Sequence, residues 1–150
     1  MIVTKNYLFL WQLKENPQIA NVDKNRHFTI NQMTPKEVLK KWIEYFNAAD
    51  IESISEMYAE NAINHQVANE PIIGKKAIRA MFIREFSNAD MVCMPENIFE
   101  DGEWAIMEWR DPKELRGCGF FHIQNDKIVF QRGYWDKLSF HKLYNIPLEQ

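Results

Sequence analysis

The chain has 150 residues and a mass of 17.9 kDa, which is the size of one domain and excludes two folded domains joined by a linker. Apolar residues make up 46% and charged residues 26%, a balance that excludes a disordered chain and a membrane span. The net charge of -3 argues against a nucleic-acid-binding protein, because phosphate contacts need a basic face. Ten Phe, five Tyr and five Trp residues either fill a core or line a cavity, and composition leaves both open.

Residues 1–33 differ from the rest of the chain in having scattered polar residues and no sustained periodicity. The apolar run from Tyr7 to Leu13 is shorter than the roughly 20 residues that a membrane-spanning helix needs, and no Ala-x-Ala-like cleavage site accompanies it. Cys93 and Cys118 form no C-x-x-C motif and no disulfide framework. We therefore expect a cytoplasmic protein with a weakly packed N-terminal extension at 1–33, a compact domain at 34–140 and a C-terminal tail at 141–150.

The helical part of the domain begins at Thr34-Pro35-Lys36-Glu37, which has the residues of a capping box with Pro in the first turn. Apolar residues then recur at helical spacing as far as Ala49. Asp50 is suited to cap a second helix over 51–58, and a third is predicted over about 75–86.

The second half of the chain has the pattern of strands. A short extended segment is predicted at 62–67, followed by strands at 91–99, 103–110, 116–124 and 127–136. The turn residues Asp101-Gly102, Asp111-Pro112 and Asn125-Asp126 separate these strands. The predicted fold class is α+β, with three N-terminal helices packed on a strongly curved, mostly antiparallel sheet.

Four motifs in the same order resemble the nuclear transport factor 2-like superfamily, especially its SnoaL-like and ketosteroid isomerase-like branches. The run from Trp42 to Ala62, with its central Ala49-Asp50-Ile51-Glu52, resembles the first two helices of those branches. Gly74-Lys75-Lys76-Ala77-Ile78 is similar to their "G-R-E-A-I" segment, and Lys127-Ile128-Val129 with Tyr134-Trp135-Asp136 resembles their closing "G-K-I-V…Y-W-D". The resemblance covers about residues 34–140 and implies a cone with a deep internal pocket that holds a small apolar molecule.

The catalytic residues of those branches are not matched. The resemblance places Gln66, Trp42 and Gly119 where ketosteroid isomerases have a carboxylate base, a Tyr and a protonated Asp. Gly133 stands where SnoaL-type cyclases have an Asp. None of these side chains can do the same acid or base chemistry.

Other residues remain as candidates for catalysis. His65 has a side chain suited to proton transfer near neutrality, although a structural histidine hydrogen-bonded to a neighbouring loop is the simpler interpretation. Alternation along 103–110 puts the apolar set with Met107 and Trp109 on the enclosed side. Glu108 and Arg110 then lie on the outside, where a cross-strand ion pair is the simplest role for such residues. The reverse orientation would turn Glu108 and Arg110 into the pocket, where with Asp136 they would resemble the Asp-Arg-Asp set of limonene epoxide hydrolases. The candidate catalytic residues are therefore His65, Glu108, Arg110 and Asp136.

The same alternation predicts the wall of the pocket. Gly117, Gly119 and Gly133 are expected to mark either curvature of the sheet or space for a flat ligand. The expected lining residues are Trp42, Phe46, Tyr58, Gln66, Met81, Met107, Trp109, Gly119, Phe121, Gln131, Gly133 and Trp135.

Two classes of function stay open. One is a small-molecule-binding protein with an aromatic pocket and acid–base chemistry of the isomerase, cyclase or dehydratase type, the epoxide-hydrolase-like reaction being a further alternative. The other is a non-catalytic ligand-binding or dimerisation module. No metal-binding motif or cofactor motif is present, so we expect neither a metal nor a cofactor. The opposite sheet face, with Trp104, Ile106, Cys118 and Phe120, is apolar and predicts a homodimer.

Overall fold

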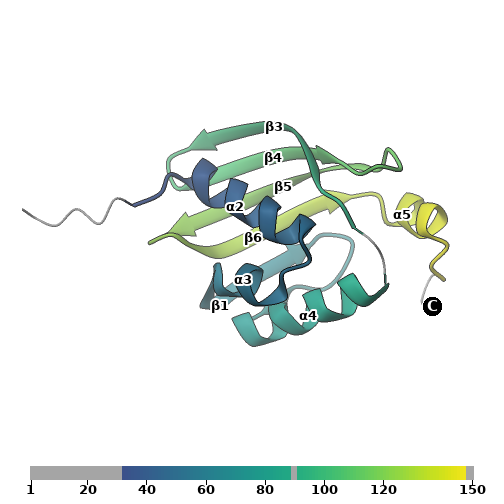
Figure 1. The fold of residues 1–150 in the computed structure, drawn as a ribbon, viewed down its shortest axis with the longest axis horizontal. Coiled ribbons are helices and arrows are strands. Elements are labelled where there is room, and N and C mark those ends of the chain that lie inside the picture. Colours follow the sequence, from purple (N-terminus) through teal and green to yellow (C-terminus); the bar gives the residue numbers. More distant parts are fainter. Residues whose placement is uncertain (1–31, 89–90, 148–150) are drawn as a thin grey trace, which may run out of the picture. The chain divides into compact units, whose positions relative to one another are not determined.

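The computed structural model describes residues 32–88 and 91–147 (Figure 1). The predicted extension at 1–33 lies outside these residues except for its last two positions, and so do the last three residues of the predicted tail. Along the described residues, two helices precede a pair of strands, a third helix comes next, and four strands and a last helix complete the order.

Six strands form one curved, unclosed sheet in the order β2-β1-β6-β5-β4-β3. Their bounds are β1 Tyr58–Gln66, β2 Ile72–Ile73, β3 Met94–Asp101, β4 Trp104–Arg110, β5 Arg116–Gln124 and β6 Lys127–Trp135. All neighbouring strands are antiparallel except β1 and β6, which are parallel. The predicted α+β class with a mostly antiparallel sheet is confirmed.

The four helices are α2 Pro35–Asn47, α3 Ile51–Glu56, α4 Lys75–Asn88 and α5 Lys137–Tyr144. Figure 1 shows α2 lying across the sheet, α4 beside β1, and α5 beyond the end of β6. Val38, Leu39 and Trp42 of α2 pack in one core with Met107 of β4 and Phe121 of β5. We call the sheet face that carries this core the inner face and the opposite one the outer face. In the described part, no helix is long and apolar enough to cross a membrane.

The first helix begins as the sequence predicts. The Thr34 hydroxyl accepts a hydrogen bond from the Glu37 backbone N–H, and the Glu37 carboxylate accepts one from the Thr34 N–H, which is a complete capping box. The second helix ends at Glu56, two residues earlier than predicted. Tyr58 instead begins β1 because it pairs with Ile128 of β6, and tertiary pairing outweighs the helical spacing there.

Helix α5 is absent from the sequence prediction. Asp136 forms its N-cap, since its Oδ1 accepts a hydrogen bond from the Ser139 N–H at 2.6 Å. The helix ends at Asn145, which has a left-handed backbone conformation. The sequence signal for this helix is Asp136 three residues before Ser139, followed by apolar residues at helical spacing.

Candidate functional site

A cavity of about 700 Å³ lies between the helices and the inner face of the sheet. Its volume is within the range of small-molecule sites. The lining includes every predicted residue except Tyr58, namely Trp42, Phe46, Gln66, Met81, Met107, Trp109, Gly119, Phe121, Gln131, Gly133 and Trp135. Tyr58 is fully buried behind this wall.

Aromatic rings pack against one another along the helical side of the cavity. Trp42 stacks on Phe46 with ring centroids 4.9 Å apart and meets Phe121 edge-on at 5.1 Å. Phe86 stacks on Phe82 at 5.6 Å and meets Phe46 edge-on at 5.3 Å. Rings at such separations form a rigid apolar wall.

Tyr58 connects the helical wall to the sheet. Its hydroxyl accepts a hydrogen bond from Trp42 Nε1 at 2.9 Å and donates one to Gln131 Oε1. Asn64 Nδ2 donates to the same Gln131 oxygen at 3.1 Å. Burial raises the pKa of the Tyr58 phenol, so this residue holds its neighbours as a neutral group.

Asn64, Gln66 and Gln131 together form what we call the amide cluster. Gln66 Nε2 donates to Asn64 Oδ1 at 2.9 Å, and Gln66 Oε1 accepts from Trp135 Nε1 at 3.1 Å. Gln131 is buried in the cavity wall, and its Nε2 group donates to no other described residue. The cluster therefore presents a neutral N–H donor to the cavity.

The sheet glycines make room for neighbouring side chains. A Cβ on Gly117 would lie 2.5 Å from the Trp109 ring and 2.6 Å from the Tyr134 backbone oxygen. A Cβ on Gly133 would lie 2.0 Å from Gln66 Oε1. The space expected for a flat ligand is thus occupied at these two positions by the protein's own Trp and Gln.

His65 lies on the outer face. Asn64 and Gln66 point to the inner face, and alternation along β1 turns His65 away from them. His65 is opposite Arg132 of β6 in the strand register. It does not line the cavity, so the structure does not bring it to the ligand site.

The three other predicted catalytic residues also lie outside the cavity. Glu108 is exposed and accepts a hydrogen bond from Asn97 Nδ2 at 2.7 Å, and Arg110 pairs with Glu96 at 3.4 Å. Both follow the strand alternation that buries Ala105 and Met107 on the inner face. Asp136 caps α5, and the hydrogen bonds from Ser139 lower its pKa. No epoxide-hydrolase-like set of these residues is assembled.

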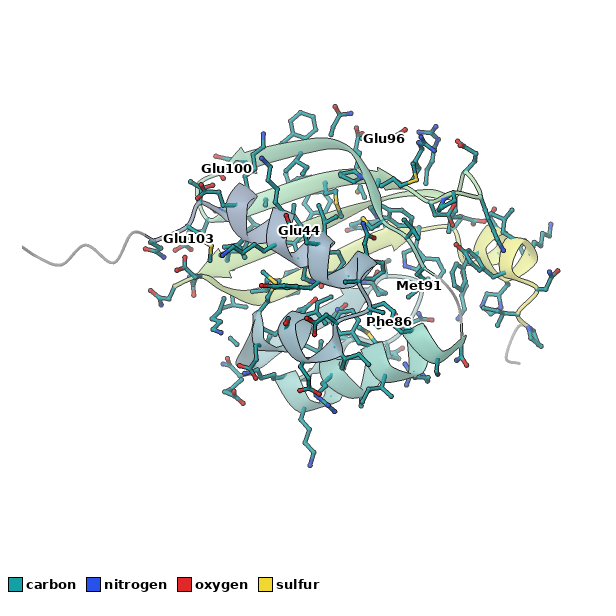
Figure 2. All side chains as sticks on the ribbon, in the orientation of Figure 1. Glu44, Phe86, Met91, Glu96, Glu100 and Glu103 are labelled. Carbon is teal, nitrogen blue, oxygen red and sulfur yellow. The ribbon has the colours of Figure 1, made fainter. Side chains whose placement is uncertain are left out.

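Further charged groups follow the β3 edge of the sheet. Glu100 accepts a hydrogen bond from the Lys36 N–H, and Glu103 accepts one from Gln124 and contacts His122. Figure 2 shows Glu96 and Glu100 along β3 and Glu103 at the end of the sheet, whereas Phe86 lies on α4. Glu96, Glu100 and Glu103 therefore lie away from the cavity.

Asp111 is an acidic residue in the cavity wall that the sequence analysis treated only as part of a turn. It is 3% exposed, and its Oδ1 accepts hydrogen bonds from the backbone N–H groups of Lys113 and Leu115 at 2.8 and 2.9 Å. Its Oδ2 accepts one from the Tyr144 hydroxyl at 2.6 Å, which fastens α5 to the β4–β5 turn. Three hydrogen bonds satisfy this carboxylate, which indicates a structural role.

Glu85 on α4 is the second acidic residue that sequence reasoning missed. It lines the cavity, and no described residue forms a hydrogen bond or an ion pair with it. Burial raises the pKa of its carboxyl, and the charge of Arg84 offsets this effect only in part. The sequence signal that Glu85 faces the core is its helical spacing from Ile78, Met81 and Phe82, which places a charged residue on the apolar side of the helix.

The described residues provide neither a metal cluster nor an activated thiol. No three His, Cys, Asp or Glu side chains within 32–88 and 91–147 lie close enough together to hold a metal ion. Cys93 lines the cavity beside Met107, at 3.7 Å between the sulfur atoms. Burial raises the pKa of its thiol to about 12, so it is not a nucleophile at neutral pH.

Residues 39–131, more than half of the chain, match the family described as the SnoaL-like domain. The chain belongs to this family. No curated protein matches the sequence.

Solved structures share the fold at low sequence identity. An NTF2-like protein of unknown function from Cytophaga hutchinsonii has a TM-score of 0.64 and 14% identity, over 73% of this chain and 96% of that one. The epoxide hydrolase/cyclase-like enzyme SalBIII, described in pyran ring formation in salinomycin, has a TM-score of 0.62 and 20% identity, with coverages of 69% and 92%. A putative polyketide cyclase from Sinorhizobium meliloti has a TM-score of 0.60 and 17% identity, with coverages of 65% and 93%.

Proposed function

We propose that this SnoaL-like protein binds a small, largely apolar molecule that carries an oxygen acceptor. The observation that carries the proposal is the Gln131 Nε2 group, an N–H donor without a protein partner among the described residues, in the wall of an aromatic cavity. The rings would contact the apolar body of the ligand, and the amide cluster would orient its oxygen.

Neutral amides favour binding and orientation over acid–base chemistry by the residues predicted from the sequence. His65, Glu108, Arg110 and Asp136 all lie away from the cavity lining. Hydrogen bonds from Tyr58 and Trp135 hold the amide cluster in one arrangement before a ligand arrives. Such preorganisation reduces the free-energy cost of binding.

A matched pair of ligands tests the proposal. Calorimetric titration with 2-tetralone and with tetralin compares two molecules of one shape that differ by a carbonyl oxygen. We expect the ketone to bind about three- to tenfold more tightly, because a net hydrogen bond contributes about 1 kcal/mol. Gln131→Met should remove that preference, whereas Gln124→Met, an exposed amide at the end of β5, should keep it. Absence of binding by both compounds would overturn the proposal.

We also propose that the outer face pairs with a second copy of the chain. Trp104, Phe120, Phe130 and Tyr134 surround a hollow of about 150 Å³ on this face, next to Arg132. The Nε atom of Arg132 is buried without a hydrogen-bond partner among the described residues. A self-complementary contact would cover this aromatic patch. Sedimentation equilibrium should show a dimer that Trp104→Lys dissociates, and a wild-type monomer at micromolar concentration would contradict the pairing.

A further inference from the structure

Glu85 is a half-buried carboxylate of the cavity wall with which no described residue forms a hydrogen bond or an ion pair. Asp111, the other deeply placed acid, accepts three hydrogen bonds. Glu70 also lines the cavity but is exposed. Helix α4 places Glu85 one turn after Met81 and Phe82, which are buried in the same wall.

The electrostatic surroundings of Glu85 favour a cation beside it. Glu85 is half-buried in the cavity wall, and burial is the largest cause of its raised pKa, so the carboxylate has lost part of its hydration. A buried carboxylate that gains a charged hydrogen-bond partner recovers much of that lost solvation.

The cationic side chains of the cavity do not supply this partner. Arg84 is exposed and forms no ion pair with Glu85. Lys137 on α5 donates to the Asn69 side chain at 3.0 Å and to the Ala68 carbonyl. His141 on the same helix contacts the backbone oxygen of Ile146. Among the described residues, none of these cationic side chains is paired with Glu85.

Aromatic rings next to Glu85 in the sequence and in the core suit an organic cation. Phe82 of α4 and Phe46 of α2 line the cavity and meet edge-on, and Phe86 stacks on Phe82. An ammonium group is attracted to ring faces as well as to the carboxylate. A hydrocarbon body in the cavity would fill the remaining apolar space.

We propose that Glu85 makes the cavity selective for apolar amines, whose ammonium group it binds beside Phe82 and Phe46. This inference rests on the proposed function, because it assigns a second polar group to the ligand of the same cavity. The ligand class is a small hydrocarbon or ring system with a basic nitrogen at the α4 end and an oxygen at the amide cluster.

The test adds a third compound of the same shape, 2-aminotetralin, which is cationic at neutral pH. In wild-type protein we expect it to bind about tenfold more tightly than tetralin, the size of one charge-assisted hydrogen bond. Glu85→Gln should remove this preference, so that 2-aminotetralin and tetralin bind with equal affinity. Glu108→Gln, a matched change on the outer face, should leave all three affinities unchanged.

The outcomes separate the two proposals. If tetralin and 2-tetralone bind and the amine binds no more tightly, the selectivity for amines is wrong and the binding function stands. If the preference for the amine survives in Glu85→Gln, Glu85 is not its cause and the inference is overturned. If none of the three binds, both proposals fail. Glu85→Leu provides a second test of the amine preference should Glu85→Gln fold poorly, with the melting temperature of each variant as the control for folding.

Discussion

The two faces of the sheet are built from the same strands and both carry aromatic rings, but they differ in their polar groups. The inner face carries aromatic rings, glycines and the neutral amides Asn64, Gln66 and Gln131. The outer face and the β3 edge carry ion pairs and the hydrogen-bonded Glu108. Strand alternation separates the two sets, and a shift of one residue would exchange them. Titratable side chains in a strand therefore indicate catalysis only once the face they occupy is known.

The largest expected difference between the faces is in stability. Phe121→Ala removes a ring that is 1% exposed and packs on Trp42, and it should lower the free energy of unfolding by about 3–5 kcal/mol. Phe99→Ala on β3 removes a ring that is 55% exposed and should change it by no more than about 0.5 kcal/mol. Urea denaturation of both variants measures the contrast, and equal losses would contradict it.

Gly117→Ala tests whether the inner wall needs its glycines for packing. The added Cβ would lie within 2.6 Å of both the Trp109 ring and the Tyr134 backbone oxygen, so the strand or the ring must move. We expect a loss of about 1–3 kcal/mol by chemical denaturation. Gly119→Ala is the comparison, because its nearest neighbour is the Phe121 ring at 2.9 Å and no backbone atom lies as close. A smaller loss at Gly117 than at Gly119 would show that sheet curvature, rather than contact, explains these glycines.

Tyr58→Phe removes the hydroxyl that joins Trp42 to Gln131. The Trp42 N–H then loses its acceptor in a buried site, and an unsatisfied buried donor costs about 1–2 kcal/mol. Tyr134→Phe makes the same chemical change on the outer face, where the ring is 43% exposed, and should alter stability by less than about 0.5 kcal/mol. Thermal unfolding followed by circular dichroism measures both variants. Equal melting temperatures for the two would mean that the buried hydroxyl is dispensable.

Local patterns, which depend on periodicity and caps, predicted the α+β class, and all the expected lining residues except Tyr58 lie in the cavity wall. The Thr34 capping box and the alternation along β4 are read directly from neighbouring residues. The strand that begins at Tyr58 depends on pairing with β6, some 70 residues away in the chain, which no local pattern contains. The importance of Glu85 was missed for a related reason. A lone acid on an apolar helix face becomes informative only when the groups around it are known to leave it unpaired.

The smallest expected effect concerns Glu85 and depends on pH. Burial raises its pKa in the folded protein above the value in the unfolded chain, so the folded state holds the proton more tightly. Below the unfolded-state pKa the residue is protonated in both states and has no effect. As the pH rises through the unfolded-state and then the folded-state pKa, ionisation favours the unfolded chain and stability falls.

Glu85→Gln removes this ionisation, so the variant should be more stable than the wild type at neutral pH and equally stable in acid. Melting temperatures from about pH 3.5 to about pH 8, without ligand, measure the difference. Glu108→Gln changes the same functional group on the outer face and should show no comparable gain. A Glu85→Gln variant that is less stable than the wild type at neutral pH would mean that the carboxylate already has a stabilising partner in the protein. A ligand-binding residue is expected to behave in the opposite way, costing stability until the ligand supplies its partner.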